Sequence, residues 1–75
     1  MPRFFFHLDD GTRLDQDGEG EEFSDLEAAR IAAMRFAREV VAERLVTEEN
    51  LQKLRVLVTD AGGRELATIR WLDLN

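Results

Sequence analysis

The segment DQDGEGEE of residues 15–22 is rich in acidic side chains, and four of them are spaced as candidate metal ligands. They are Asp15, Asp17, Glu19 and Glu22, and carboxylate oxygens are the ligands that calcium prefers. Counted from Asp15, the segment resembles an EF-hand loop, with acidic residues at positions 1, 3 and 5 and glycine at position 6. Position 12 holds Leu26 in place of the bidentate glutamate, and an expected strand precedes the loop where an EF-hand has a helix. We therefore interpret the segment as a solvated acidic turn, with a divalent-metal-responsive module as the alternative.

His7 is the only histidine, and the chain has no cysteine. One histidine without cysteine cannot form a recognisable transition-metal site, and a general base also needs a reacting group within reach. The single serine, Ser24, already has an expected role at the start of a helix. We therefore predict no catalytic residue, no metal or other cofactor and no enzymatic activity. His7 is expected on the outer face of a sheet.

The net charge of −6 argues against a general nucleic-acid binder, because such proteins neutralise phosphates. Four arginines nevertheless fall within one expected helix, and they are Arg30, Arg35, Arg38 and Arg44. Glu27 and Glu39 are spaced to pair with two of them, which indicates a solvated helix face. A nucleic-acid-associated, antitoxin-like regulator is a further alternative.

The length of 75 residues suits one small domain, residues 1–75, and 44% of the chain is hydrophobic. A core of this size leaves roughly 3–5 kcal/mol of net stability, which dimerisation would supplement. The absence of cysteine favours a reducing compartment. No apolar run reaches membrane-spanning length, and Asp9 and Asp10 follow the opening too early for a signal peptide. We expect a cytoplasmic protein without membrane contact.

Two hairpins are predicted, one at each end of the chain. Residues 3–8 are typical of a strand, and Asp10-Gly11 is a favoured hairpin turn. Residues 12–14 would return as a short strand, which residues 20–23 could extend. The second hairpin is indicated by residues 53–60 and 64–72, because both segments alternate in polarity and glycines separate them.

A long helix is predicted between the hairpins. Ser24 is expected as the N-cap, Glu27 completes a capping box, and apolar residues recur at helical spacing to about Val46. Thr47 can cap a further short turn. The order is therefore ββαββ, an α+β fold with two layers, in which an antiparallel sheet of three or four strands packs on one long helix.

The outer face of this sheet is the predicted contact surface, since a single helix covers only one face. The residues expected to face the core from the first strand are Phe4, Phe6 and Leu8. Phe5 and His7 would then point away from the core, beside Leu57 and Leu66. This face is too apolar for full solvent contact. We predict a non-catalytic protein-interaction module that contacts a second copy or an unknown protein through Phe5, His7, Leu57 and Leu66.

Four stretches resemble a family of small uncharacterised bacterial proteins: MPRFFFHLDDG, Gly20-x-Glu22, the SDLEAAR of residues 24–30, and LRVLVTDAGGREL. Members of that family begin MPRYFFH or MPRFFFH and carry a DLEAAR helix, and this chain has Phe4 where tyrosine is common. The family is a domain of unknown function. The resemblance implies a short bacterial cytoplasmic protein and supplies no catalytic residue. The recurring histidine of the family matches His7, which implies a functional or partner-contact role for it.

Overall fold

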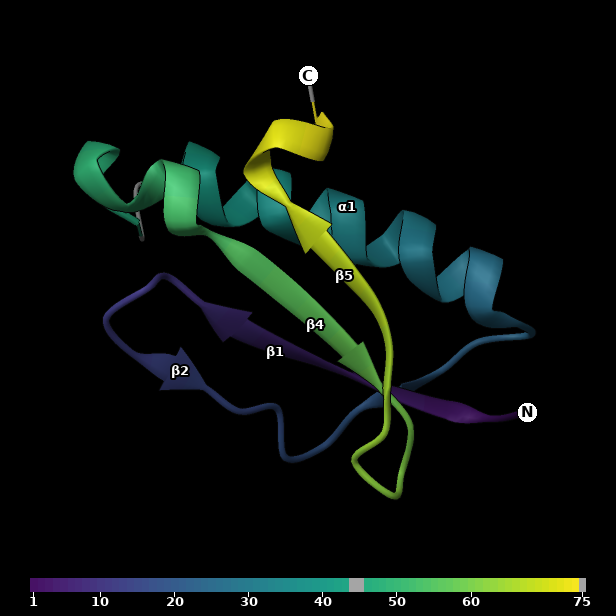
Figure 1. Cartoon of the computed structure of the whole chain (residues 1–75). Helices are drawn as coiled ribbons and strands as arrows, with labels where there is room; N and C mark the ends of the chain where they lie inside the picture. Colours follow the sequence, from purple (N-terminus) through teal and green to yellow (C-terminus); the bar gives the residue numbers. More distant parts are fainter. Residues whose placement is uncertain (44–45, 75) are drawn as a thin grey trace.

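The computed structural model describes residues 1–43 and 46–74. Its elements are β1 (Arg3–Asp9), β2 (Leu14–Asp15), β3 (Glu21–Glu22), α1 (Leu26–Ala42), the 3-10 helix η1 (Glu48–Lys53), β4 (Arg55–Thr59), β5 (Glu65–Arg70) and the 3-10 helix η2 (Trp71–Leu74). The predicted α+β fold is confirmed, with one long helix on one face of an antiparallel sheet (Figure 1).

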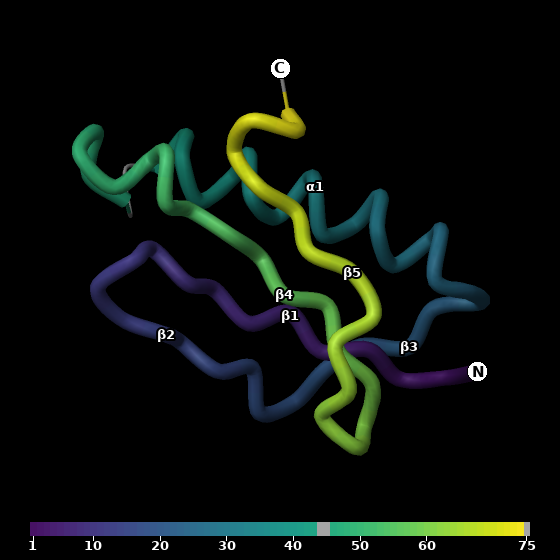
Figure 2. The backbone as a smooth tube through the Cα atoms, in the orientation of Figure 1, coloured from purple at the N-terminus to yellow at the C-terminus, as the bar shows by residue number. Residues whose placement is uncertain are grey.

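The sheet has the order β2-β1-β4-β5, and every neighbouring pair is antiparallel. β1 pairs with β4 from Phe5↔Thr59 to Asp9↔Arg55. β2 pairs with the end of β1 and β3 with its beginning, so residues 16–20 interrupt a single return strand (Figure 2). The predicted extension of the second strand is confirmed at Glu21–Glu22, and the two short pieces bring the number of strands to five.

The start of α1 differs by one residue from the prediction. Asp25, not Ser24, is the N-cap, and its carboxylate accepts a hydrogen bond of 2.8 Å from the backbone N–H of Ala28. Phe23 still donates its N–H to the carbonyl of Pro2, so the chain leaves the sheet too late for Ser24 to take the capping position. Glu27 pairs with Arg30 at 3.0 Å instead of closing a capping box.

The end of α1 also comes earlier than the predicted Val46. The helix ends at Ala42, and the N–H of Glu43 donates to the carbonyl of Glu39. Arg44 and Leu45 lie outside the described residues. Val46 is buried beyond the helix, in a small cluster with Val40 and Leu54.

The core forms between α1 and the second hairpin. Ala29, Ala33 and Ala37 are at most 1% exposed, and their small side chains bring the helix backbone close to the sheet. The residues that meet them from the strands are Val56, Val58 and Ile69, together with Phe4. α1 therefore lies over β4 and β5 rather than over β1. Phe6 and Leu8, both expected in the core, are left only half-buried.

Candidate functional site

A groove between α1 and β1 follows from this placement of the helix. Phe6 and Leu8 of β1 form one apolar wall, and Phe36 and Val40 of α1 form the other. Asp15, Gln16 and Asp17 lie along its rim, and its volume is about 410 Å³. We call this feature the α1–β1 groove. It lies on the helix side of the sheet, whereas the contact surface predicted from the sequence lies on the outer side.

A second hollow of about 270 Å³ continues the groove toward the start of the helix. The two hollows share Phe6 and Phe36, whose rings are stacked with centroids 6.3 Å apart. The second hollow adds Ala32 to the apolar lining, and its charged residues are Glu21, Arg35 and Glu39. The residues Ala32, Arg35, Phe36, Glu39 and Val40 follow helical spacing, so one stripe of α1 lines the whole groove.

The acidic loop contacts the outer face of β1 through Asp17 and Gly20. Phe5 and His7 stack with their rings nearly parallel and their centroids 6.5 Å apart. Gly20 has a φ of 69°, and a Cβ at that position would lie 2.8 Å from the ring of Phe5. The loop therefore packs on Phe5 and needs glycine there, both for its backbone conformation and for the close approach.

His7 connects this loop to β4 through both ring nitrogens. Its Nδ1 accepts a hydrogen bond of 3.0 Å from the backbone N–H of Asp17, and its Nε2 lies 3.0 Å from Oγ1 of Thr59. A backbone N–H can only donate, so Nδ1 carries no proton and the neutral ring is protonated at Nε2. Nε2 therefore donates its proton to Oγ1 of Thr59, and it cannot accept the proton of the Thr59 hydroxyl. This arrangement does not provide a general base.

Asp17 holds the shape of the acidic loop. Its carboxylate accepts hydrogen bonds from the backbone N–H groups of Phe6, Glu19 and Gly20, at 3.0–3.1 Å. Partial burial acts to raise the pKa of Asp17, but these backbone donors outweigh it and keep the pKa below its ordinary value. Asp17 thus supplies to β1 the acceptor that a continuous return strand would have supplied.

The four acidic residues proposed as metal ligands do not converge. Asp15 pairs with Arg13, and Glu22 pairs with Arg3 and with the N-terminal amine. Asp17 is directed to backbone N–H groups, as described above. Among residues 1–43 and 46–74, no group of three or more His, Asp or Glu side chains is arranged to hold a metal ion. Asp15, Asp17 and Glu22 are therefore engaged in surface ion pairs or backbone hydrogen bonds.

Of the remaining predicted contact residues, one is on the outer face as expected and the other is displaced. Leu57 is half-buried there, paired with His7 across the strands. Leu66 is the extra residue of a bulge, because Val58 pairs with Ala67 and Thr59 with Glu65. It packs against the core, so its predicted place on the outer face is wrong.

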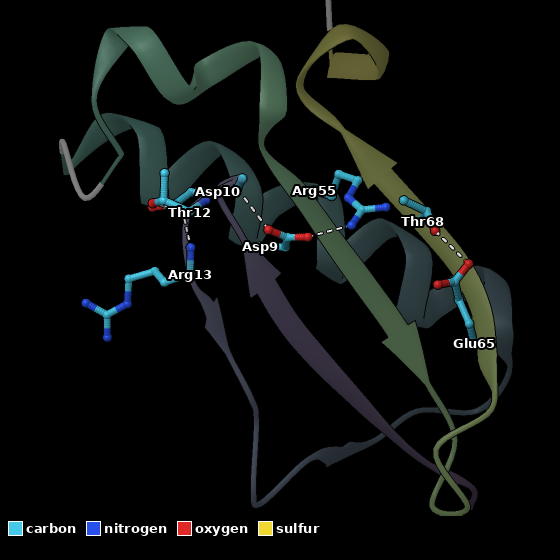
Figure 3. Close-up of polar contacts among 8 residues, drawn as sticks. Asp9, Asp10, Thr12, Arg13, Arg55, Glu65 and Thr68 are labelled. Carbon is cyan, nitrogen blue, oxygen red and sulfur yellow. Dashed lines mark hydrogen bonds and ion pairs between the residues drawn. The ribbon is translucent and has the colours of Figure 1, made fainter.

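Polar contacts lie at two places on the sheet (Figure 3). Arg55 of β4 donates to the carboxylate of Asp9 on β1, and Thr68 of β5 donates to Glu65 at 3.1 Å. These hydrogen bonds account for several charged groups on the sheet. The outer face is consequently less apolar than the sequence pattern suggested.

Of the three helix arginines within the described residues, two have acidic neighbours and the third, Arg38, is exposed. Arg30 is paired with Glu27, and Arg35 lines the groove together with Glu39. Arg44 lies outside the described residues. No helix within the described part of the chain is long and apolar enough to cross a bilayer.

The groove was not predicted, although its residues carried a signal. Phe36 falls within the apolar repeat predicted for the helix, yet Arg35 precedes it and Glu39 lies three residues after it. At helical spacing both charged residues lie on the same side of Phe36, which indicates a boundary between buried and exposed helix faces. That signal identifies an edge of the helix, but not which strand lies opposite.

The family model described as "Domain of unknown function (DUF6894)" matches residues 3–73. This match confirms the resemblance to an uncharacterised family. No curated protein and no solved structure gives a significant match. The matched range includes every residue of the α1–β1 groove and of the His7 contacts.

Proposed function

The chain belongs to the DUF6894 family of unknown function, and from this premise we propose that it is a non-catalytic protein-interaction module that binds through the α1–β1 groove. The observation that carries the proposal is the incomplete cover of β1. Phe6, Leu8 and Phe36 are large apolar side chains that remain half-buried beside a groove of about 410 Å³. Apolar grooves of this kind are sites where proteins bind other proteins.

The absence of enzymatic activity is part of the proposal. The best candidate for catalysis is the contact between His7 and Thr59, and its hydrogen bonds require the proton on the nitrogen that a general base would use. The metal-responsive and nucleic-acid-associated alternatives receive less support. Asp15, Asp17 and Glu22 of the first alternative and Arg30 of the second are engaged in ion pairs or backbone hydrogen bonds within the chain.

A second candidate function is self-association through the outer face of the sheet. Leu57 supports it, because this half-buried apolar residue lies at the centre of a face without a covering helix. We keep the cytoplasm as the proposed location, on the absence of cysteine.

Site-specific photocrosslinking in cells tests the main proposal. A photoreactive benzoylphenylalanine replaces Gln16 on the rim of the groove, and in a matched control it replaces Leu72, which is 62% exposed on η2. We expect a discrete protein adduct from position 16 that is absent from position 72 and is lost when Phe36 is also changed to Ser. The same adducts from both positions, or none from position 16, would contradict the proposal.

A further inference from the structure

We propose that the occupant of the α1–β1 groove is a short amphipathic helix of a partner protein, with apolar anchors and flanking Lys or Arg residues. This inference rests on the proposed function and deepens it. It is carried by three features of the groove: the charge of its rim, the state of the strand backbone beside it, and its length.

The charge of the rim favours a cationic partner. Its carboxylates are those of Asp15, Asp17, Glu21 and Glu39, and Arg35 is the only cation among its described lining residues. Asp15 is paired with Arg13 and Asp17 accepts backbone N–H groups, whereas Glu21 and Glu39 take part in none of the ion pairs formed within the described part of the chain. A partner with Lys or Arg beside its apolar residues would supply counter-charges to Glu21 and Glu39, which line the same hollow as Phe36.

The backbone beside the groove favours a helix over an added strand. Strand addition requires free N–H and C=O groups at a sheet edge. β1 is already paired with β4 along one edge, and β2, β3 and the side chain of Asp17 pair with it as well. The groove therefore offers side chains rather than backbone groups. An amphipathic helix that inserts apolar side chains into a groove is the recognition mode that uses such a surface.

The length of the groove sets the size of the partner segment. Its helix side runs from Ala32 to Val40, which is about 12 Å at 1.5 Å per residue. A partner helix lying along it would contact it over about two turns, with anchors three and four residues apart. An interface this short is small, so we expect weak binding that depends on salt.

The test is an amide NMR titration of the whole chain with two synthetic helical peptides. Both have leucines at the same positions, and the remaining positions are lysine in one peptide and glutamate in the other. We expect the Leu/Lys peptide to shift the amide signals of Phe6, Leu8, Phe36 and Val40, with binding that weakens as salt is added. The Leu/Glu peptide should leave these signals unchanged. Binding of both peptides alike, or of neither, overturns the inference.

Charge-reversed variants provide the matched comparison. Glu39→Lys alters the rim of the groove, and Glu49→Lys makes the same change of charge on η1, where Glu49 is exposed and lines no part of the groove. We expect Glu39→Lys to weaken binding of the Leu/Lys peptide about fivefold and Glu49→Lys to leave it unchanged. Equal weakening by both variants would mean that only net charge matters, and would overturn the inference.

Failure of this inference can be distinguished from failure of the proposed function. A groove-specific adduct from position 16, without binding of the Leu/Lys peptide, would leave the interaction module standing and overturn only the cationic helix. Concentration-dependent shifts at Phe6 and Phe36 in the protein alone would show that a second copy fills the groove, which also overturns it.

Discussion

Three residues on three segments explain how the outer face is held together. His7 of β1 accepts from the N–H of Asp17 and contacts the hydroxyl of Thr59, which is only 6% exposed. A single ring thus satisfies a loop N–H and a buried hydroxyl at once, which explains a lone histidine without assigning chemistry to it. Its role is to attach the acidic loop to β4.

The first prediction concerns the tautomer of His7. Because Nδ1 accepts from a backbone N–H, we expect neutral His7 to carry its proton on Nε2. Long-range proton–nitrogen correlation spectra of the ring at neutral pH measure this directly. A spectrum of the Nδ1-protonated tautomer would contradict the assigned contacts and would reopen the question of a general base.

The second prediction concerns Asp17. The Asp17→Ala substitution leaves the N–H groups of Phe6, Glu19 and Gly20 without their acceptor, so we expect it to lower the free energy of unfolding by about 2 kcal/mol. Asp15→Ala is the matched control in the same loop. Asp15 is exposed and pairs only with Arg13 within the described residues, so its loss should cost less than about 0.5 kcal/mol. Urea denaturation measures both, and equal losses would contradict the role of Asp17.

Acidification provides a second measurement on the same residue. The pKa of Asp17 lies below its ordinary value of 3.8. Two other carboxyl groups behave alike: the hydrogen bond from Arg55 lowers the pKa of Asp9, and the hydrogen bond from the N–H of Thr12 lowers the pKa of Asp10. A lowered pKa means that the folded state favours the carboxylate, so the stabilisation is present above the ordinary value and is lost as the pH falls through the folded pKa. We expect the free energy of unfolding to fall below about pH 4, with a smaller fall in Asp17→Asn.

At the scale of elements, the third prediction concerns the start of α1. Asp25 caps the N–H of Ala28, whereas Ser24 is exposed and does not have this role. We expect Asp25→Ala to lower the free energy of unfolding by about 1 kcal/mol and Ser24→Ala to change it by a few tenths at most. Thermal or urea unfolding of the two variants decides between the adjacent positions, and a larger loss from Ser24→Ala would restore the capping box predicted from the sequence.

The repeating spacing of apolar residues along the chain was enough to predict the long helix and the main strands. The alternation of Leu54, Val56 and Val58, all nearly inaccessible to solvent, and the spacing of the helix alanines both depend on local backbone geometry. The N-cap at Asp25 and the bulge at Leu66 were not predicted, and the reasons for this are also local. Ser24 and Asp25 have equal capping ability, and one extra residue at Leu66 changes the face without changing the composition.

The position of α1 across the sheet could not be predicted in this way. It depends on how the alanine stripe fits against β4 and β5, which is a property of many side chains together. A pattern shows that Phe6 and Phe36 are apolar, but the distance of the helix from β1 decides whether they meet in a closed core or along a groove. The site was missed because it is created by packing.

At the scale of the molecule, the fourth prediction concerns self-association through the outer face. Leu57→Thr removes an apolar side chain from the centre of that face without touching the acidic loop contacts. We expect sedimentation velocity to show a concentration-dependent dimer of the unchanged protein that this substitution weakens. Phe5→Ser combined with Leu57→Thr should weaken it further, with some loss of stability because Phe5 packs on Gly20.

The control for this prediction is Ile31→Thr, a similar loss of apolar surface on the helix, where Ile31 is 46% exposed. It should leave the dimer unchanged. A monomer at every concentration, or a dimer that Ile31→Thr weakens as much as Leu57→Thr does, would remove the outer face from consideration as a self-contact.

The pairing of β1 with β4 also determines the order in which the chain can assemble. Phe5 pairs with Thr59, so the central seam of the sheet joins segments from opposite parts of the chain. Closing so long a loop costs chain entropy before the pairing gives any stability in return. The last hairpin and α1 are made of local contacts, and β1 can pair early only with the short β2 and β3, whereas its five-residue pairing with β4 has to wait until residues 55–59 are available. During synthesis the first strand is therefore an apolar segment without its main partner, a period in which chaperones or unwanted strand pairing have access to it.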